Sequence, residues 1–211
     1  MAIVERKSTE QRFIVHTDWN GYLRILDTVD ARTRVTYDRG TLEIMTLSRK
    51  HELVKTILEC LVQAILNERR VDYTTGGSMT FSRKDLDRGL EPDASYWIAH
   101  CKALAGHTDY DAFVHPPPDL VLEADVTRRS IKRLGIYEAM RVPEVWLYDR
   151  RGKLNVHVLN EDGVFDLRDQ SATFPWLKMS VVQEHVQKGL RGTTAQAVWA
   201  FQDYLRTLQA P

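Results

Sequence analysis

Residues 116–149 constrain the fold most, because two apolar runs there flank a segment with a helical hydrophobic period. Three consecutive prolines lead into the first run, and the period is helical from about residue 128 to residue 140. The pattern predicts a strand, a helix and a strand. Glu123 and Asp125 follow the first apolar run and lie where α/β folds bind ligands, beyond the carboxyl end of a strand.

Four basic residues come directly after these acids: Arg128, Arg129, Lys132 and Arg133. On a helix they spread around most of the circumference, so only one or two can face a common site. Cations in the first turn of a helix oppose its macrodipole, so helix stability does not explain them. The stretch therefore places acids that can hold a metal beside bases that can hold phosphate.

Composition limits the protein class. The 211 residues suffice for one core, so we expect a single domain over residues 1–211, with its core at about 30–180 and the N-terminal and C-terminal helices peripheral. Lysine plus arginine equals aspartate plus glutamate at 29 each, which neither supports nor excludes a nucleic-acid partner. Cys60 and Cys101 lack metal-ligand spacing, and we expect free thiols in a reducing compartment. With no apolar stretch long enough for a membrane span and no signal-peptide pattern, we expect a cytoplasmic protein that does not contact a membrane.

The rest of the chain predicts alternating helices and strands. The clearest element is an amphipathic helix that begins after Ser48, with apolar residues every three or four positions up to Leu66. Residues 1–12 are expected to be loosely ordered, and residues 82–92 to be a polar, turn-rich stretch. The remaining expected elements are a helix from Thr17 as its cap to about residue 29, hairpins at 33–45 and 154–167, a strand at 94–98, and closing helices at 180–188 and 194–208.

Acidic residues recur at strand positions, and Asp93, Glu123 and Glu43 are candidates for a metal site. Carboxylate oxygens suit Mg²⁺ or Mn²⁺, which polarise a phosphodiester and lower the pKa of a bound water. A solvated strand end explains many single acids. Asp93 and Glu123 are the stronger candidates because each adjoins an apolar strand. His51 lies at the edge of the apolar stripe of its helix and can serve either as a structural residue or as a functional one.

Four segments in order carry a family resemblance: YDRGTLEIMTLSRKHE (37–52), GLEPDASYWI (89–98), PPPDLVLEADVTRRS (116–130) and IYEAMRVPEVWLYD (136–149). The sequence resembles the Uma-two family of restriction endonucleases, within the PD-(D/E)XK nuclease superfamily. The resemblance implies a restriction-endonuclease-like α/β (α+β) core, a mixed central sheet flanked by helices with added β-hairpins. It implies that Asp93 and Glu123 are metal ligands, and that Glu43 and His51 match recurrent family positions. Glu52 is the alternative to Glu43.

The sequence departs from the superfamily pattern at the expected lysine, because Asp125 occupies that position. In many members of the family, a lysine four residues before a helical tyrosine substitutes for it. Counting back from Tyr137 gives Arg133, with Lys132 next to it. Either residue can supply a cation, but an arginine does not readily act as a base because its pKa exceeds about 12.

The leading hypothesis is a metal-dependent DNA endonuclease. Asp93 and Glu123 bind Mg²⁺ or Mn²⁺ with help from Glu43 or Asp125, and Lys132 or Arg133 stabilises the developing charge. The alternative is a catalytically impaired module that keeps the nuclease fold and serves in nucleic-acid binding or assembly. A plain structural or dimerisation domain is the third possibility. A homodimer is expected in each case, since twofold pairing is the commonest oligomer.

Overall fold

The computed structural model describes residues 11–30, 32–126 and 131–208 of the chain. The helices are α1 (Trp19–Leu26), α2 (Arg49–Glu68), α3 (Cys101–Leu104), α4 (Arg133–Ala139), α5 (Met179–Arg191), α6 (Thr194–Thr207) and the short 3-10 helix η1 (Lys84–Leu86). The strands are β1 (Arg12–His16), β2 (Thr33–Asp38), β3 (Thr41–Thr46), β4 (Thr74–Thr75), β5 (Phe81–Arg83), β6 (Arg88–Leu90), β7 (Ala94–Trp97), β8 (Leu120–Asp125), β9 (Glu144–Asp149), β10 (Leu154–Leu159) and β11 (Phe165–Arg168).

The larger of the two sheets in the described part of the chain has six strands in the order β11-β10-β9-β8-β7-β4. Strands β8 and β9 are parallel, whereas the other neighbours are antiparallel. The parallel pair results from the strand, helix and strand predicted for residues 116–149, because the crossover through α4 returns the chain in the same direction. The predicted mixed sheet flanked by helices is confirmed.

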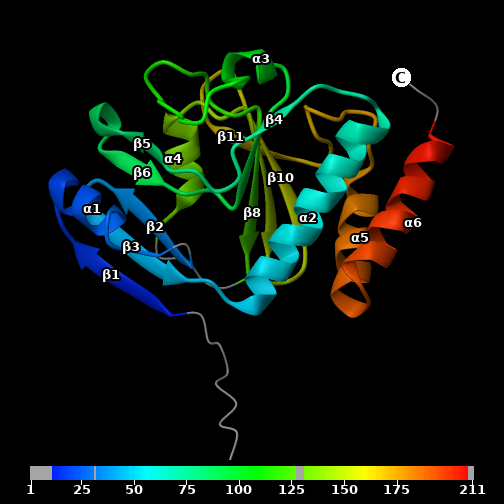
Figure 1. Cartoon of the computed structure of the whole chain (residues 1–211), viewed down its shortest axis with the longest axis horizontal. Coiled ribbons are helices and arrows are strands. Elements are labelled where there is room, and N and C mark those ends of the chain that lie inside the picture. Colours follow the sequence, from blue (N-terminus) through cyan, green and yellow to red (C-terminus); the bar gives the residue numbers. More distant parts are fainter. Residues whose placement is uncertain (1–10, 31, 127–130, 209–211) are drawn as a thin grey trace, which may run out of the picture.

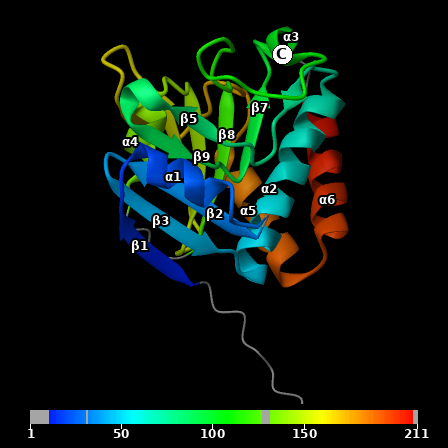
Figure 2. The same cartoon turned by 60° about the vertical axis from the view of Figure 1, so that its left-hand side comes forward.

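Helices α2, α5 and α6 cover one face of the six-stranded sheet (Figures 1 and 2). Ser48 caps α2 as expected, through its side-chain oxygen, which accepts from the backbone N–H of His51. The apolar stripe of α2 packs against β7 to β10, and α5 and α6 contribute Val186 and Phe201 to the same core. These two helices therefore form part of the core layer and are not peripheral additions.

Helix α4 covers the opposite face of the six-stranded sheet, together with strands β5 and β6 of the second sheet. Side chains along β8 alternate between the two faces, as the pleat of a strand requires. Leu122 packs under α2, whereas Val121 packs under α4 with Ile136. By the same alternation, Glu123 faces the α4 side, which places it between the two sheets.

The second sheet has five antiparallel strands in the order β1-β3-β2-β6-β5 (Figure 2). Its central hairpin, β2 and β3, was predicted from the sequence, and its turn uses positive φ at Arg39 and Gly40. Helix α1 packs on this sheet, where Tyr22 stacks on Tyr37 with ring centroids 5.0 Å apart.

Three local expectations were wrong. Residue Arg12, placed in a loosely ordered stretch, begins strand β1, which pairs with β3. The polar residues 82–92 contain strand β6. This strand pairs with β2 and β5, although its sequence has a weak strand pattern. The cap of α1 is Asp18 rather than Thr17, because the Asp18 carboxylate accepts from the backbone N–H of Gly21.

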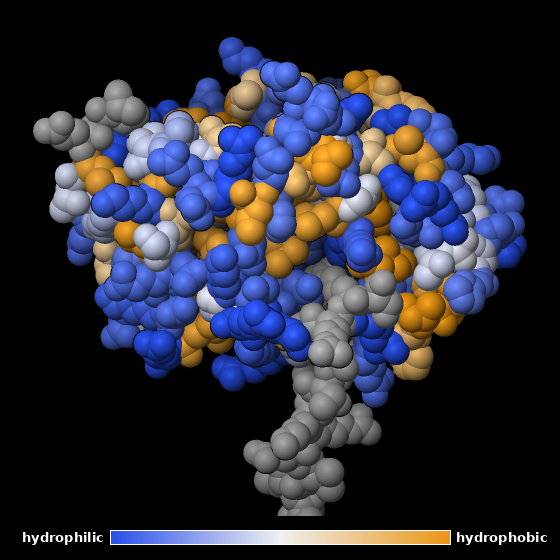
Figure 3. Space-filling model, turned by 180° about the vertical axis from the view of Figure 1, so that it is seen from behind, coloured by the Kyte–Doolittle hydropathy of each residue, from blue (hydrophilic) through white to orange (hydrophobic). Residues whose placement is uncertain are grey.

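Three further observations concern the molecule as a whole. None of the helices that the structure describes is long and apolar enough to span a membrane. Cys60 and Cys101 are free thiols, as predicted. The face in Figure 3 is mostly hydrophilic, with hydrophobic areas near its middle.

Candidate active site

Asp93, the residue before β7, lies opposite Glu123 of the adjacent strand β8. Ala94 of β7 pairs with Leu122 of β8, so the antiparallel register carries the preceding Asp93 to the position opposite Glu123. Both side chains are almost fully buried, with exposed fractions of 1% and 2%. Buried carboxylates require hydrogen-bonding partners, and here each acid has a different set.

Asp93 is held at both of its carboxylate oxygens. Oδ2 accepts a hydrogen bond of 2.7 Å from the backbone N–H of Ala124, and Oδ1 lies 2.9 Å from Nε2 of His51. Because a carboxylate only accepts, the imidazole donates from Nε2. His51 stands in the first turn of α2 and is 1% exposed. His51 therefore fixes the orientation of Asp93.

Arg133 is the partner of Glu123. Its Nη2 lies 2.6 Å from Glu123 Oε1 and 2.5 Å from the backbone carbonyl of Glu91. Its Nη1 donates to Oγ1 of Thr36 at 3.1 Å. Thr36 belongs to β2 and Glu91 follows β6, so the guanidinium joins the five-stranded sheet to the six-stranded sheet through α4. Burial lowers the pKa of Arg133, but Glu123, Tyr137 and Asp93 raise it, and the net pKa lies above its ordinary value.

Tyr137 completes this group one helical turn after Arg133. Its hydroxyl donates to Glu123 Oε1 and accepts from Nη2 of Arg133 at 3.1 Å. Burial raises the pKa of Tyr137 well above its ordinary value, and the Glu123 carboxylate adds to the rise, so the hydroxyl keeps its proton. Oε1 of Glu123 thus accepts hydrogen bonds from two buried donors.

Glu43 lies beside this group on the five-stranded sheet. It pairs with Thr36 across the antiparallel ladder of β2 and β3, so the two side chains occupy the same face of that sheet. Thr36 accepts from Arg133, so Glu43 lies on the face of the five-stranded sheet that the guanidinium contacts. Its carboxylate is 2% exposed and lies 3.6 Å from Nε of Arg12.

A cavity of about 420 Å³ leads to Glu123 from the α4 side. It is lined by Asp125 and Lys132 as well as by Arg133, Tyr137 and Leu147. Asp125 is half-buried, two residues after Glu123 on the same side of β8, whereas Lys132 is exposed. Arg128 and Arg129 lie outside the described residues.

Carboxylate oxygens are the donors that Mg²⁺ and Mn²⁺ prefer, so Asp93, Glu123, Glu43 and Asp125 fit a divalent ion by chemistry. Among the residues that the structure describes, however, no three acidic, histidine or cysteine side chains are grouped closely enough to hold one. Arg133 and Tyr137 contact Oε1 of Glu123 instead. The acids are adjacent but are not arranged as a completed coordination shell.

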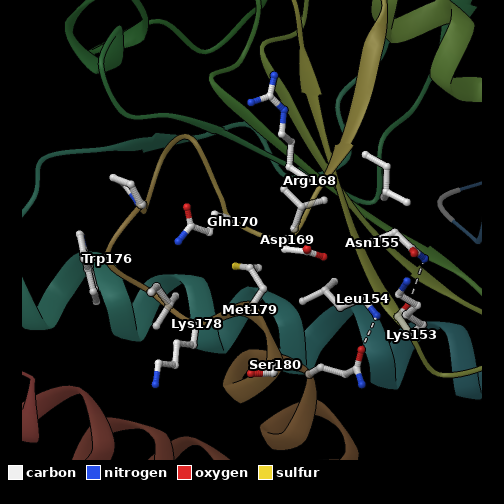
Figure 4. A pocket seen from close by; sticks show the side chains of 15 residues that line it. Lys153, Leu154, Asn155, Arg168, Asp169, Gln170, Trp176, Lys178, Met179 and Ser180 are labelled. Carbon is white, nitrogen blue, oxygen red and sulfur yellow. Dashed lines mark hydrogen bonds between the residues drawn. The ribbon is translucent and has the colours of Figure 1, made fainter.

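A second, larger pocket of about 580 Å³ lies away from these acids, between β10, β11 and the start of α5 (Figure 4). Lys153, Arg168 and Lys178 contribute basic groups to it, while Trp176 and Met179 contribute apolar surface. No residue predicted for the functional site lines this pocket.

Sequence reasoning missed three members of the site. Tyr137 served only to locate Arg133, although a tyrosine one helical turn from a cation is a recognisable signal. Thr36 is a polar residue between Val35 and Tyr37 on a buried strand, which is a weaker signal. The carbonyl of Glu91 leaves no mark in a sequence, because any residue supplies one.

Comparison with known proteins identifies the family. The sequence profile of the Uma2 family, described as "Putative restriction endonuclease", matches residues 19–187. The chain belongs to the Uma2 family. This confirms the resemblance seen in the four sequence segments, and the Uma2 match includes Glu43, His51, Asp93, Glu123 and Arg133.

A solved structure shares the fold: a crystal structure described as a putative nuclease belonging to DUF820 from Anabaena variabilis ATCC 29413. The two chains are 14% identical with a TM-score of 0.54, and the alignment covers 77% of this chain and 96% of the other. At this identity the likeness concerns the fold alone. A search of curated proteins found none that matches this member of the Uma2 family.

Proposed function

We propose that this Uma2 chain is a metal-dependent endonuclease that hydrolyses phosphodiester bonds of DNA. The observation that carries the proposal is the pair of buried carboxylates, Asp93 directly before β7 and Glu123 opposite it on β8, with a buried cation beside them. Charged side chains are rarely fully buried unless they are paired, and clusters of buried charges occur frequently at functional sites. The description of the Uma2 family names a restriction endonuclease, and the description of the Anabaena variabilis protein names a nuclease. Both descriptions support the same reaction class.

In this proposal, Asp93 and Glu123 hold Mg²⁺ or Mn²⁺, with Glu43 or Asp125 assisting. A bound ion would polarise the phosphodiester and lower the pKa of a water. His51 keeps Asp93 in position through its 2.9 Å contact, as the outer partners of metal ligands commonly do.

The two candidate cations receive different roles. Arg133 is buried against Glu123 and stays protonated, so it stabilises negative charge and does not act as a base. Lys132 is exposed at the wall of the cavity that leads to Glu123, where its ammonium can meet a phosphate of the substrate. We assign transition-state stabilisation to Arg133 and substrate contact to Lys132.

Plasmid nicking tests the proposal directly. The wild-type protein is incubated with supercoiled DNA in Mn²⁺ or Mg²⁺ and in EDTA, beside Asp93→Asn and Glu123→Gln, which keep the shape of each side chain. Asp203→Asn on α6 is the matched control, because this aspartate is exposed and far along the chain from the site. We expect nicking by the wild type and Asp203→Asn in metal only, and none by the two site variants. Equal nicking by all four proteins would refute the proposal.

A nuclease fold that binds nucleic acid without cutting it is the alternative, since Asp125 occupies the place of the expected lysine. Salt-dependent DNA binding with no nicking in any metal would select this alternative. We further propose that the protein is a homodimer, because two sites related by a twofold axis suit the cutting of both strands. A molar mass of one chain by light scattering, at the concentrations used for nicking, would exclude the dimer.

A further inference from the structure

The hydrogen bonds that Arg133 donates to described residues all go to oxygen atoms. Beyond Glu123 Oε1 at 2.6 Å, its two terminal nitrogens reach the Glu91 carbonyl at 2.5 Å, Thr36 Oγ1 at 3.1 Å and the Tyr137 hydroxyl at 3.1 Å. Carboxylate, carbonyl and hydroxyl oxygens are also the ligands of divalent cations. The guanidinium therefore occupies an oxygen-lined position beside a carboxylate that the proposed function assigns to the metal.

A second cation on the same carboxylate oxygen is costly in a buried site. Arg133 is 6% exposed and Glu123 is 2% exposed, so solvent screens the repulsion between two neighbouring cations poorly. Oε1 also accepts from Tyr137, which adds a donor that a metal has to displace. Metal binding at Glu123 and the observed Arg133 contact thus compete.

We propose that Arg133 is a cationic gate on Glu123. The guanidinium neutralises Glu123 in the metal-free protein and weakens its affinity for the divalent ion, and it moves to a phosphate of the nucleic acid when substrate binds. This inference rests on the proposed function and adds a regulation to it, namely that metal and phosphate backbone bind cooperatively at this site.

The chemistry of arginine suits such a gate better than that of lysine. A guanidinium donates hydrogen bonds to carboxylate and to phosphate oxygens through the same N–H groups, so a phosphate can replace Glu123 as the partner of Nη2. Arginine does not lose its proton in proteins, so the gate opens by exchange of an anionic partner and not by deprotonation. The adjacent Lys132 is exposed and lines the cavity by which a substrate approaches Glu123.

The first test measures binding of Mn²⁺ itself, followed by electron paramagnetic resonance of the free ion, without nucleic acid. Wild type is compared with Arg133→Met and Arg133→Lys. Arg88→Met is the matched control, because Arg88 contacts the carbonyl of Gly135 in α4 and Asp38, but not Glu123. We expect Arg133→Met to bind Mn²⁺ at least about tenfold more tightly than wild type, which is within the usual range of coupling between sites. Arg88→Met is expected to match wild type.

Thermal unfolding keeps the test decisive if removal of the buried cation weakens the fold. Arg133→Met removes the cation that contacts Oε1 of Glu123, so Mn²⁺ is expected to raise its Tm more than it raises the Tm of wild type. Arg133→Lys, which keeps the charge, is expected to show an intermediate rise. Mn²⁺ affinity and Tm shifts of Arg133→Met equal to or below those of wild type would overturn the gate.

The second test measures cooperativity. Ca²⁺ affinity is determined for wild type and Arg133→Met with and without a short DNA duplex, because Ca²⁺ takes the same oxygen ligands. We expect the duplex to increase Ca²⁺ affinity more for wild type than for Arg133→Met. An equal increase in both proteins would overturn the exchange of partners.

Glu123→Gln separates the failure of the gate from the failure of the proposed function. If Glu123→Gln binds Mn²⁺ as wild type does, the metal site is not at Glu123 and the proposed function fails together with the gate. If Glu123→Gln loses Mn²⁺ while Arg133→Met binds it as wild type does, the metal site stands and the gate alone is wrong.

Discussion

Arg133 and Glu123 form a buried ion pair in which Nη2 lies 2.6 Å from Oε1, with side-chain exposures of 5% and 2%. The pair connects α4 to β8, and the remaining contacts of the guanidinium extend to β2 and to the residue after β6. A buried pair of this kind is neutral or modest in net stability, whereas the loss of one partner is strongly destabilising. The hydrogen bonds of Arg133 therefore also connect the two sheets.

The two neighbouring cations are expected to differ in their effect on stability. Arg133→Met removes the cation that contacts Oε1 of the buried Glu123 carboxylate, so we expect the metal-free protein to lose about 3–5 kcal/mol of unfolding free energy. Lys132→Met removes an exposed side chain and is expected to change stability by less than about 0.5 kcal/mol. Urea unfolding in EDTA measures both, and similar losses in the two variants would contradict the assignment of Arg133 as the buried partner.

Tyr137→Phe removes the hydroxyl that donates to Oε1 of Glu123 and accepts from Nη2 of Arg133. The substitution removes a hydrogen bond to a charged acceptor while keeping the ring, so we expect a loss of about 1.5–3 kcal/mol. Tyr204→Phe on α6 is the control, since no hydrogen bond of its hydroxyl is observed among the described residues. Urea unfolding of the two variants gives the comparison; a Tyr137→Phe protein as stable as Tyr204→Phe would show that the hydroxyl contributes little.

The elements that carry the site were predictable because local sequence determines them. The apolar run before Glu123, the change of period after it and the Ser48 cap of α2 each specify an element by short-range chemistry. Strand β6 was not predictable in this way, because one side of its ladder depends on β2, which is distant in the sequence.

The acids of the site could be identified individually, but their partners could not. Asp93 and Glu123 adjoin apolar runs, which marks them in the sequence. The pairing of Arg133 with Thr36 and with the Glu91 carbonyl arises only when the second sheet packs against α4. The spacing from Tyr137 selects Arg133 over Lys132, and the structure separates the two by burial and by the hydrogen bond of Arg133 to Glu123.

Glu59 on α2 gives a pH dependence of stability. Burial raises the pKa of Glu59, while Lys55 lowers it and the nearby Asp93 and Glu52 raise it further. A carboxyl group with a raised pKa in the folded state binds its proton more tightly there than in the unfolded chain. Its contribution to stability is present below the unfolded pKa and is lost as the pH rises through the folded pKa.

We therefore expect Glu59→Gln to be more stable than wild type at pH 7, with a smaller difference at pH 4.5. Urea unfolding at the two pH values measures the change, with Glu184→Gln on the surface of α5 as the control. A gain that is the same at both pH values would mean that ionisation of Glu59 is not its cause.

His51 is predicted to act by positioning Asp93, and its substitution should affect metal binding and cleavage together. His51→Ala removes the Nε2 contact with Oδ1, leaving the Ala124 N–H as the other observed donor to Asp93. Because partners behind metal ligands typically contribute 10- to 100-fold, we expect a decrease of about that size in Mn²⁺ affinity and in nicking rate at subsaturating metal. His51→Gln retains an N–H donor and should recover part of both. If instead nicking falls while Mn²⁺ affinity stays at the wild-type value, His51 acts on the substrate rather than through Asp93.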